Sequence, residues 1–236
     1  METAKAAGMK HAVLTTQAGC GFDLWPTAVT LPDGRPYNYT IRESPFKRDL
    51  VREFVDAARA TGLLPGLYYI VNNNYFLSIR AGEAVPATAP GQVAVTEAQY
   101  FALVLAQLRE LWSDYGELTE LWFDGGCPEG LRAAVGDLLT ELQPNAVRFQ
   151  GPTDAQAIRW VGSESGRAPE PNWIQAQSSV DYGPGDPDGA IVAPAEADTT
   201  LASTGEWYED QQQHSKAEPS HIVLARTQVL EASAAD

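Results

Sequence analysis

Cysteine and histidine are scarce in this sequence. Two cysteines, Cys20 and Cys127, and three histidines occur among 236 residues. Two cysteines are too few for a disulfide framework, although they leave open one disulfide between them. The scattered histidines give no zinc signature either. We therefore expect no metal and no organic cofactor.

Positive charge and long apolar runs are also lacking. The chain has 16 Lys and Arg residues against 31 Asp and Glu residues, which gives a net charge of −15. Nucleic acids and anionic membrane surfaces attract basic proteins, so we expect neither as a partner. The sequence contains no run of about 18 apolar residues, so we expect no membrane span. Residues 1–10 lack the apolar core of a signal peptide. The sequence leaves the cellular compartment unknown.

Apolar and aromatic residues, by contrast, are plentiful. The chain is 44% hydrophobic, which is enough for a sizeable core, and it includes six Trp and nine Tyr. Buried aromatic rings mainly pack a core, but flat rings also bind sugar rings face to face. A neutral substrate, or none, fits this composition better than an acidic one does.

Strand-like and helix-like segments alternate along the chain. Helices are expected at residues 48–61, 96–115 and 131–142, and strands at 10–16, 63–71, 118–124, 146–150, 158–162 and 190–195. Such alternation implies an α/β fold with a parallel sheet, whose strands are covered on both faces and therefore read as continuous apolar runs. An open doubly wound sheet and a barrel both fit. No G-x-G-x-x-G or P-loop follows a strand, which weakens the nucleotide-binding version.

Asp124 stands out because it ends the apolar run L-T-E-L-W-F-D-G-G-C. A buried strand that stops there would hold the carboxylate rigidly at its carboxyl end, beside glycines that let another group approach. In a barrel of alternating strands and helices, the chemistry sits at these strand ends. The simpler alternative is a turn residue, since Asp-Gly is common turn chemistry.

Other polar and aromatic residues follow the remaining predicted strands. A ring of carboxylates, amides and aromatic side chains at strand ends suits a polyhydroxylated ligand, and a pair of carboxylates is the core machinery of sugar hydrolysis. The N-N-N run could instead be turn chemistry, and a tryptophan is more often a core residue than a binding platform. The segments concerned are residues 17–26, residues 72–76, Asp124, Glu164, Glu196, Asp198 and residues 206–208.

Five motifs in order resemble the α-L-fucosidases of glycoside hydrolase family 29. They are G-F-D-L-W-P-T, R-D-L-V-R-E-F-V-D-A-A-R, G-L-Y-Y, E-L-W-F-D-G and I-R-W-V-G-S-E-S-G, and they span roughly residues 1–208. The C-G-F pattern at Cys20 and the R-W-V-G-x-E-x-G segment are similar to the branch that acts on α-1,3/1,4-linked fucose.

The resemblance implies a TIM-like (β/α) barrel and a retaining mechanism. Asp124 would be the nucleophile and Glu164 the general acid/base, about 5–5.5 Å apart; Glu196 is the second candidate for the acid/base. The substrate would be a fucosylated oligosaccharide or glycoconjugate. Five side chains are then expected to contact the sugar: Trp25, Tyr69, Asn73, Trp122 and Trp160.

The sequence also departs from the family pattern. Gln17 and Ala18 stand where family members usually have a Lys-His pair, so the histidine that should bond the sugar is absent. The first and last barrel strands are not recognisable. We therefore expect residues 1–210 to form an incomplete barrel domain, followed by a polar tail at 211–236. A non-catalytic relative that binds sugar, or is purely structural, is the alternative to an active enzyme.

Overall fold

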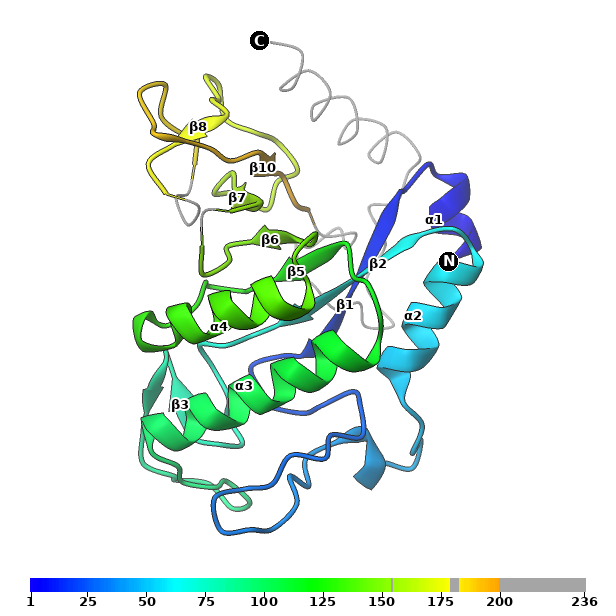
Figure 1. Cartoon of the computed structure of the whole chain (residues 1–236), viewed down its shortest axis with the longest axis vertical. Helices are drawn as coiled ribbons and strands as arrows, with labels where there is room; N and C mark the ends of the chain where they lie inside the picture. The colour runs from blue at the N-terminus through cyan, green and yellow to red at the C-terminus, as the bar shows by residue number, and fades with distance from the viewer. Residues whose placement is uncertain (154, 179–182, 200–236) are drawn as a thin grey trace. The chain divides into compact units, whose positions relative to one another are not determined.

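The computed structural model describes residues 1–153, 155–178 and 183–199. They belong to two compact units, Met1–Gln156 and a second that begins at Ala157 (Figure 1). The predicted polar tail at 211–236 and residues 206–208 lie outside the described residues. Among the described residues, no helix is both long and apolar enough to cross a membrane.

The first unit is a parallel sheet with helices between its strands. The strands lie in the order β1 (His11–Gln17), β2 (Leu64–Tyr69), β5 (Glu120–Trp122) and β6 (Val147–Phe149), and each is parallel to its neighbour. The connections contain α2 (Leu50–Ala60), α3 (Glu97–Asp114) and α4 (Glu129–Leu142), after a short α1 (Glu2–Ala6). A 3-10 turn (Ile41–Glu43) and a small hairpin of β3 (Ile79–Arg80) and β4 (Glu83–Ala84) complete this unit. The predicted alternation of strands and helices is confirmed.

Two of the helices, α2 and α3, begin where the sequence supplies a side-chain cap. Asp49 precedes α2, and its carboxylate accepts a hydrogen bond from the backbone N–H of Arg52. Thr96 precedes α3 and forms a capping box with Gln99, in which each side chain bonds the other residue's backbone N–H. Such caps satisfy donors that the first helical turn leaves unpaired. They explain why both helices start within two residues of the predicted positions.

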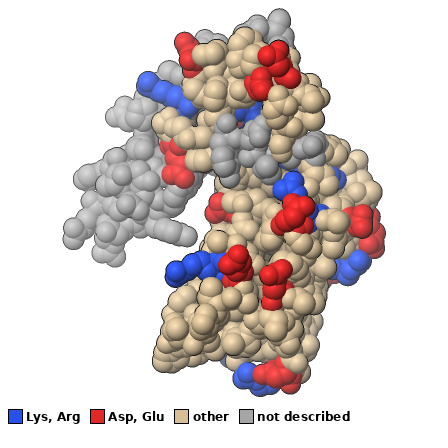
Figure 2. Space-filling model, turned by 90° about the vertical axis from the view of Figure 1, so that its left-hand side faces the viewer, with Lys and Arg blue, Asp and Glu red and all other residues tan. Residues whose placement is uncertain are grey.

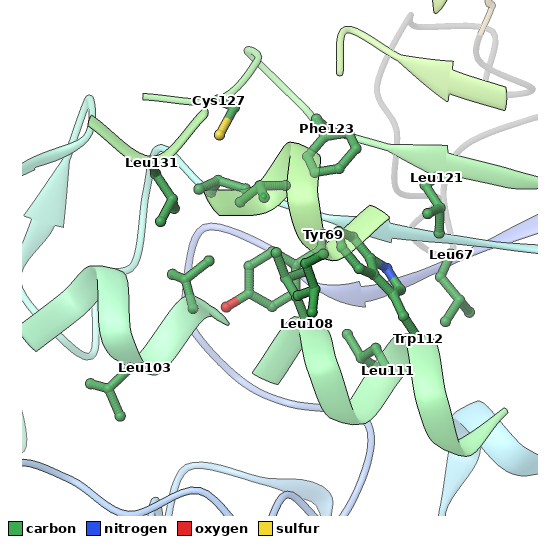
Figure 3. Close-up of a cluster of buried hydrophobic side chains, with 14 of the residues drawn as sticks. Leu67, Tyr69, Leu103, Leu108, Leu111, Trp112, Leu121, Phe123, Cys127 and Leu131 are labelled. Atoms are coloured by element: carbon green, nitrogen blue, oxygen red, sulfur yellow. The ribbon is translucent and has the colours of Figure 1, made fainter. Parts of the chain in front are cut away.

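The core of the first unit lies between one face of the sheet and the helices. Figure 3 shows strand residues Leu67 and Leu121 facing Leu108 and Leu111 of α3. All four side chains are at most 2% exposed. Because side chains alternate along a strand, Tyr69 and Phe123 also point to this core, while Tyr68 and Trp122 point to the opposite face. The opposite face carries the candidate site.

An ion pair near the amino ends of the strands makes stability depend on pH. His11 Nε2 lies 3.1 Å from Glu120 Oε2, and Glu120 is 2% exposed. Hydrogen bonding to the Glu120 carboxylate raises the pKa of His11 above 6.5, its ordinary value, against the opposing effect of burial. The protonated imidazole is thus favoured in the folded chain. Its stabilisation is complete below about pH 6.5 and is lost as pH rises through the raised pKa.

We expect the His11→Gln variant to lose this pH dependence. The free energy of unfolding of the parent chain should fall more between pH 6 and pH 8.5 than that of the variant, because only the parent loses a proton from the pair. Urea unfolding at both pH values measures the difference. A parent-minus-variant difference that is the same at both pH values would contradict the linkage.

The second unit contains two pairs of short strands. β7 (Ala157–Trp160) pairs in parallel with β10 (Ala195–Glu196), and β8 (Gln175–Ala176) pairs antiparallel with β9 (Ile191–Val192). The strand predicted at 190–195 is confirmed in part: β9 lies within this range, but residue 195 belongs to a separate strand, β10, with a different partner. β8 lies outside every predicted strand, in a stretch rich in proline and glycine.

A buried arginine organises the second unit. Arg159 of β7 is 0% exposed, and its guanidinium donates to Asn172 Oδ1 at 2.9 Å. It also donates to the backbone carbonyls of Trp173 and Gly183. Arginine's fork of donors suits it to bind several oxygens at once. Arg159 thus holds the segments around residues 172 and 183 against β7.

Candidate active site

Asp124 lies at the carboxyl end of β5, as predicted. The strand ends at Trp122, and Asp124 follows it as a half-buried side chain. The hydroxyl of Tyr68 donates a hydrogen bond of 2.5 Å to Asp124 Oδ2. In the described residues Oδ1 accepts no hydrogen bond. The carboxylate therefore has one fixed oxygen and one oxygen available for chemistry.

An aromatic stack stands beside this carboxylate. Tyr68, Trp122 and Phe149 occupy matching positions on three adjacent parallel strands. The Trp122 ring lies 3.8 Å from the Phe149 ring and 5.3 Å from the Tyr68 ring, centroid to centroid, and is nearly parallel to both. Stacking of this kind adds about 0.5–1.5 kcal/mol per pair beyond simple burial. The stack makes a rigid wall next to Asp124.

The loop after Asp124 is held by its neighbours. Gly125 has a φ of +71°, which favours glycine, and its N–H donates to Gln150 Oε1 at 3.2 Å. The side-chain amide of Asn72 donates to the carbonyl of Gly125, and to that of Gly126 at 3.3 Å. Asn72 follows β2, so the loops after two adjacent strands are tied together.

The other two asparagines of the N-N-N run also have structural partners. Asn73 Oδ1 accepts a hydrogen bond from the N–H of Ala81 at 3.1 Å, and its side chain is half-buried. Asn74 is 0% exposed, and its side chain bonds the N–H of Leu77 and the hydroxyl of Tyr37. A Cβ on Gly21 would come within 2.2 Å of Asn74 Oδ1, so the C-G-F pattern needs glycine here.

Asp23 lies at the centre of a buried network behind the strand ends. Its two oxygens accept hydrogen bonds from the side-chain amides of Gln17 and Gln107, both at 2.6 Å. The hydroxyl of Tyr69 donates to Gln107 Oε1 at 2.6 Å, and Asp23 is 0% exposed. Burial raises the pKa of Asp23 well above its usual range, although the Gln17 hydrogen bond opposes this shift. The network ties the segment after β1 to β2 and α3.

We expect Asp23→Ala to lower the free energy of unfolding by about 3 kcal/mol, since the buried amide of Gln107 loses its acceptor and that of Gln17 keeps only a longer hydrogen bond, of 3.3 Å, to Gln107 Oε1. Asp23→Asn should cost far less. The folded chain favours protonated Asp23, so the contribution of this group is complete at acid pH and declines as pH rises from 3.8 through the raised pKa. The asparagine variant should therefore gain stability relative to the parent between pH 5 and pH 8 in urea unfolding. Equal differences at both pH values would contradict the raised pKa.

Glu164 lies in the second unit, on the loop that follows β7. Its side chain is exposed. The loop is fixed on both sides: the N–H of Val161 donates to the carbonyl of Glu196 at 3.0 Å, and that of Gly166 to the carbonyl of Asp198 at 2.8 Å. The indole N–H of Trp160 donates to Asp198 Oδ1 at 2.6 Å, so Asp198 holds this loop through backbone and side chain. Glu196, the second candidate for the acid/base, is half-buried in β10.

Comparison with known proteins identifies the family. The family model of α-L-fucosidases matches residues 1–166, a segment that includes Asp124 and Glu164. The chain belongs to the α-L-fucosidase family. A protein of Oryza sativa subsp. japonica assigned as α-L-fucosidase 1 is 33% identical over 87% of this chain, and α-L-fucosidase 1 of Arabidopsis thaliana is 28% identical over 88%. The chain spans only 38% and 40% of the length of these curated relatives.

Solved α-L-fucosidase-family structures share the fold. A Bacteroides thetaiotaomicron protein assigned as an α-L-fucosidase matches 89% of this chain and 50% of its own, with 31% identity and a TM-score of 0.71. A glycoside hydrolase 29 family member from an unknown rumen bacterium matches 89% of this chain and 38% of its own, with 28% identity and a TM-score of 0.69. The predicted TIM-like α/β fold is confirmed, with a sheet that is not closed in the described residues.

The residues predicted to contact the sugar differ in how far they are exposed. Trp122 and Trp160 are half-buried, and each is the last residue of its strand. Trp25 and Tyr69 are 2% and 3% exposed, and their polar atoms are used inside the protein: the Trp25 indole donates to Glu110 at 2.8 Å. Because these two rings are packed in the interior, they present almost no surface to a ligand.

Tyr68 is the residue that sequence reasoning missed. Two tyrosines in succession, Tyr68 and Tyr69, do not indicate which of the two rings faces the helices and which faces the opposite side of the sheet. The alternation of side chains from Leu67 places Tyr68 on the same face of the sheet as Trp122, but only once the register of β2 with β5 is known.

The two cysteines do not form the disulfide that the sequence left open. Cys20 and Cys127 are both free, and burial raises the pKa of Cys127 to about 12.

One face of the molecule shows how its charged side chains are distributed. The face in Figure 2 carries acidic side chains among small, separate groups of Lys and Arg, with no continuous basic patch in its described part. Among the described residues, no group of three His, Cys, Asp or Glu side chains could hold a metal ion.

Proposed function

We propose that this chain carries the catalytic centre of a retaining α-L-fucosidase, with Asp124 as the nucleophile. The observation that supports the proposal most is the W-F-D-G segment of an α-L-fucosidase family member, with its carboxylate at a strand end and one oxygen held by Tyr68. A strand end is the place where barrel enzymes carry their reactive groups.

In the proposed reaction Asp124 attacks the anomeric carbon of a terminal α-L-fucose. Tyr68 fixes the carboxylate through Oδ2, and Oδ1 forms the bond to carbon as the bond to the leaving oxygen breaks. A glycosyl ester results, with inverted configuration at the anomeric carbon. Water then displaces Asp124 with a second inversion, so the released fucose keeps the α configuration.

We propose Glu164 as the general acid/base. Its protonated carboxyl would give a proton to the leaving oxygen, and the resulting carboxylate would take a proton from the attacking water. The support is its position in the R-W-V-G-S-E-S-G motif, on a loop held by Asp198. Glu196 is the alternative for this role. Trp122, Trp160 and Asn73 are the proposed contacts to the sugar.

The proposed substrate is a terminal α-L-fucose, α-1,3- or α-1,4-linked, on an oligosaccharide or glycoconjugate. The linkage rests on the resemblance of the C-G-F and R-W-V-G-x-E-x-G segments to one branch of the family. We propose that residues 1–210 belong to one barrel domain. The proposed chemistry uses carboxylates alone and needs no cofactor.

Stereochemistry and covalent labelling test the proposal together. The purified chain should hydrolyse an aryl α-L-fucoside and release α-L-fucose first, as followed by ¹H NMR before mutarotation. A 2-deoxy-2-fluoro-L-fucosyl fluoride should label the chain, and peptide mass spectrometry should place the label on Asp124. A label on another carboxylate would reject Asp124 as the nucleophile. A folded chain without turnover or label would favour the non-catalytic alternative, which the absent Lys-His pair at Gln17 and Ala18 also favours.

A further inference from the structure

A cavity in the second unit lies on the segment that carries Glu164. It has a volume of about 580 Å³, and Ser163 and Ser165, the neighbours of Glu164 in the chain, both line it. Arg167 also lines it, together with Pro169 and Pro184. A cavity of this size is in the range of small-molecule sites.

The walls of this cavity are fixed from outside it. Buried Arg159 donates to the carbonyl of Gly183, and the N–H of Gly183 donates to the carbonyl of Trp160 at 3.2 Å. The carbonyl of Pro184 accepts a hydrogen bond of 2.7 Å from the N–H of Trp173. Among the lining residues themselves, the Ser163 and Ser165 hydroxyls bond each other at 2.8 Å. Several hydrogen bonds therefore hold the segments that line this cavity, and its shape does not depend on a single side chain.

Arg167 is unusual among the arginines of this acidic chain. Each of the other arginines in the described residues, except Arg80, has an ion-pair partner or bonds a carbonyl or hydroxyl oxygen. Arg167 and Arg80 have neither among the described residues, although the chain carries 31 carboxylate residues. Arg80 lies in the hairpin of the first unit, whereas Arg167 lines a cavity. Among the described residues, nothing occupies the five donors of its guanidinium.

The lining suits one kind of ligand. Proline rings offer apolar surface to the C–H face of a sugar, serine hydroxyls exchange hydrogen bonds with sugar hydroxyls, and a guanidinium binds planar or tetrahedral anions in a bidentate manner. The chain has a net charge of −15, which repels anions. A cationic residue that lines the cavity therefore matters more for an anionic ligand than for a neutral one.

We infer that this cavity binds the leaving group of the proposed fucosidase reaction, and that Arg167 selects a leaving-group sugar that carries a sulfate or carboxylate. The inference rests on the proposed function, because Glu164 must act on the oxygen of that leaving group. It adds a charged substrate class to the neutral one expected from composition.

Paired substrates test the selection by Arg167. Fucosyl-N-acetylglucosamine, its 6-sulfate and a fucosylated glucuronic acid are compared by kcat/KM. We expect at least one anionic substrate to be preferred by about five-fold at low salt, the effect of a charge-assisted contact that remains partly in water. Arg167→Gln should bring the ratio to about one, and Arg80→Gln, the matched control, should keep it. Raised salt should shrink the preference. The two anionic substrates separate a sulfate site from a carboxylate site.

Equal kcat/KM for all three substrates, or a preference that survives Arg167→Gln, would overturn the inference. Turnover of an aryl α-L-fucoside, which lacks a leaving-group sugar, reports on the proposed function independently. If the aryl fucoside is not hydrolysed, binding of N-acetylglucosamine 6-sulfate, glucuronic acid and N-acetylglucosamine is compared by saturation-transfer NMR. Binding of an anionic sugar that Arg167→Gln weakens supports the cavity assignment; no such difference rejects it.

Discussion

Replacing Asp124 by alanine is expected to lower kcat/KM for an aryl α-L-fucoside by about 10⁴- to 10⁶-fold, the range found when a covalent hydrolase loses its nucleophile. The physical reason is that the glycosyl ester cannot form without this carboxylate. Steady-state hydrolysis by the purified variant, checked for folding by circular dichroism, measures the loss. Asp137→Ala is the matched control, because Asp137 is an exposed aspartate on α4 of the same unit.

Azide sharpens this test, because it can enter the cavity that the missing carboxylate leaves. A single displacement by azide on the Asp124→Ala variant gives the β-fucosyl azide, with inverted configuration. Partial recovery of turnover with that product supports the role of Asp124. Full activity in the Asp124→Ala variant, or equal losses in Asp137→Ala, would reject it.

Replacing Glu164 by alanine should slow substrates with poor leaving groups by about 10²- to 10⁴-fold, the usual contribution of general acid/base catalysis. An activated aryl fucoside should be affected less in its first step, because its leaving oxygen needs little protonation. The dependence of kcat/KM on leaving-group pKa should therefore be steeper in the variant than in the parent. A series of substituted phenyl α-L-fucosides measures that slope.

With the Glu164→Ala variant, azide should give a product of the opposite anomeric configuration to that formed by the Asp124→Ala variant. It replaces water in the second step on the Glu164→Ala variant, after the Asp124 ester has formed, so it should restore turnover and give the α-fucosyl azide. Glu170→Ala, an exposed glutamate of the same unit, is the matched control. If Glu196→Ala shows the rescue and Glu164→Ala does not, the acid/base role moves to Glu196.

The sequence predicted the elements well wherever local chemistry defines them. Thr96 with Gln99 marks the start of α3, and the apolar run before Asp124 marks β5. β8 was missed because it has two residues inside a segment rich in proline and glycine, where local propensity indicates a loop. β8 is a strand because it pairs with β9. Pairing between two segments that are distant in the sequence cannot be recognised from either segment alone.

The candidate site was predicted in part for the same reason. Asp124 is recognisable because a strand, a carboxylate and glycines are contiguous. The structural role of Gln17 and Asp23 could not be predicted from their own segment. Their shared hydrogen-bond partner, Gln107 on α3, is 84 residues away from Asp23 in the sequence. The polar stretch 17–26, which starts at the last residue of β1, therefore resembled a ligand-binding segment, whereas two of its polar residues, Gln17 and Asp23, are bonded to each other in the interior.

The stack of Tyr68, Trp122 and Phe149 gives the molecule a spectroscopic consequence. Tryptophan emission depends on the polarity around the indole. Trp25 and Trp112 are 2% and 3% exposed, so they sense mainly protein. Trp122 is half-buried, lies two residues before Asp124, and stacks on two other rings. Of these three, Trp122 is the fluorophore through which a molecule seated on Asp124 becomes visible without a label.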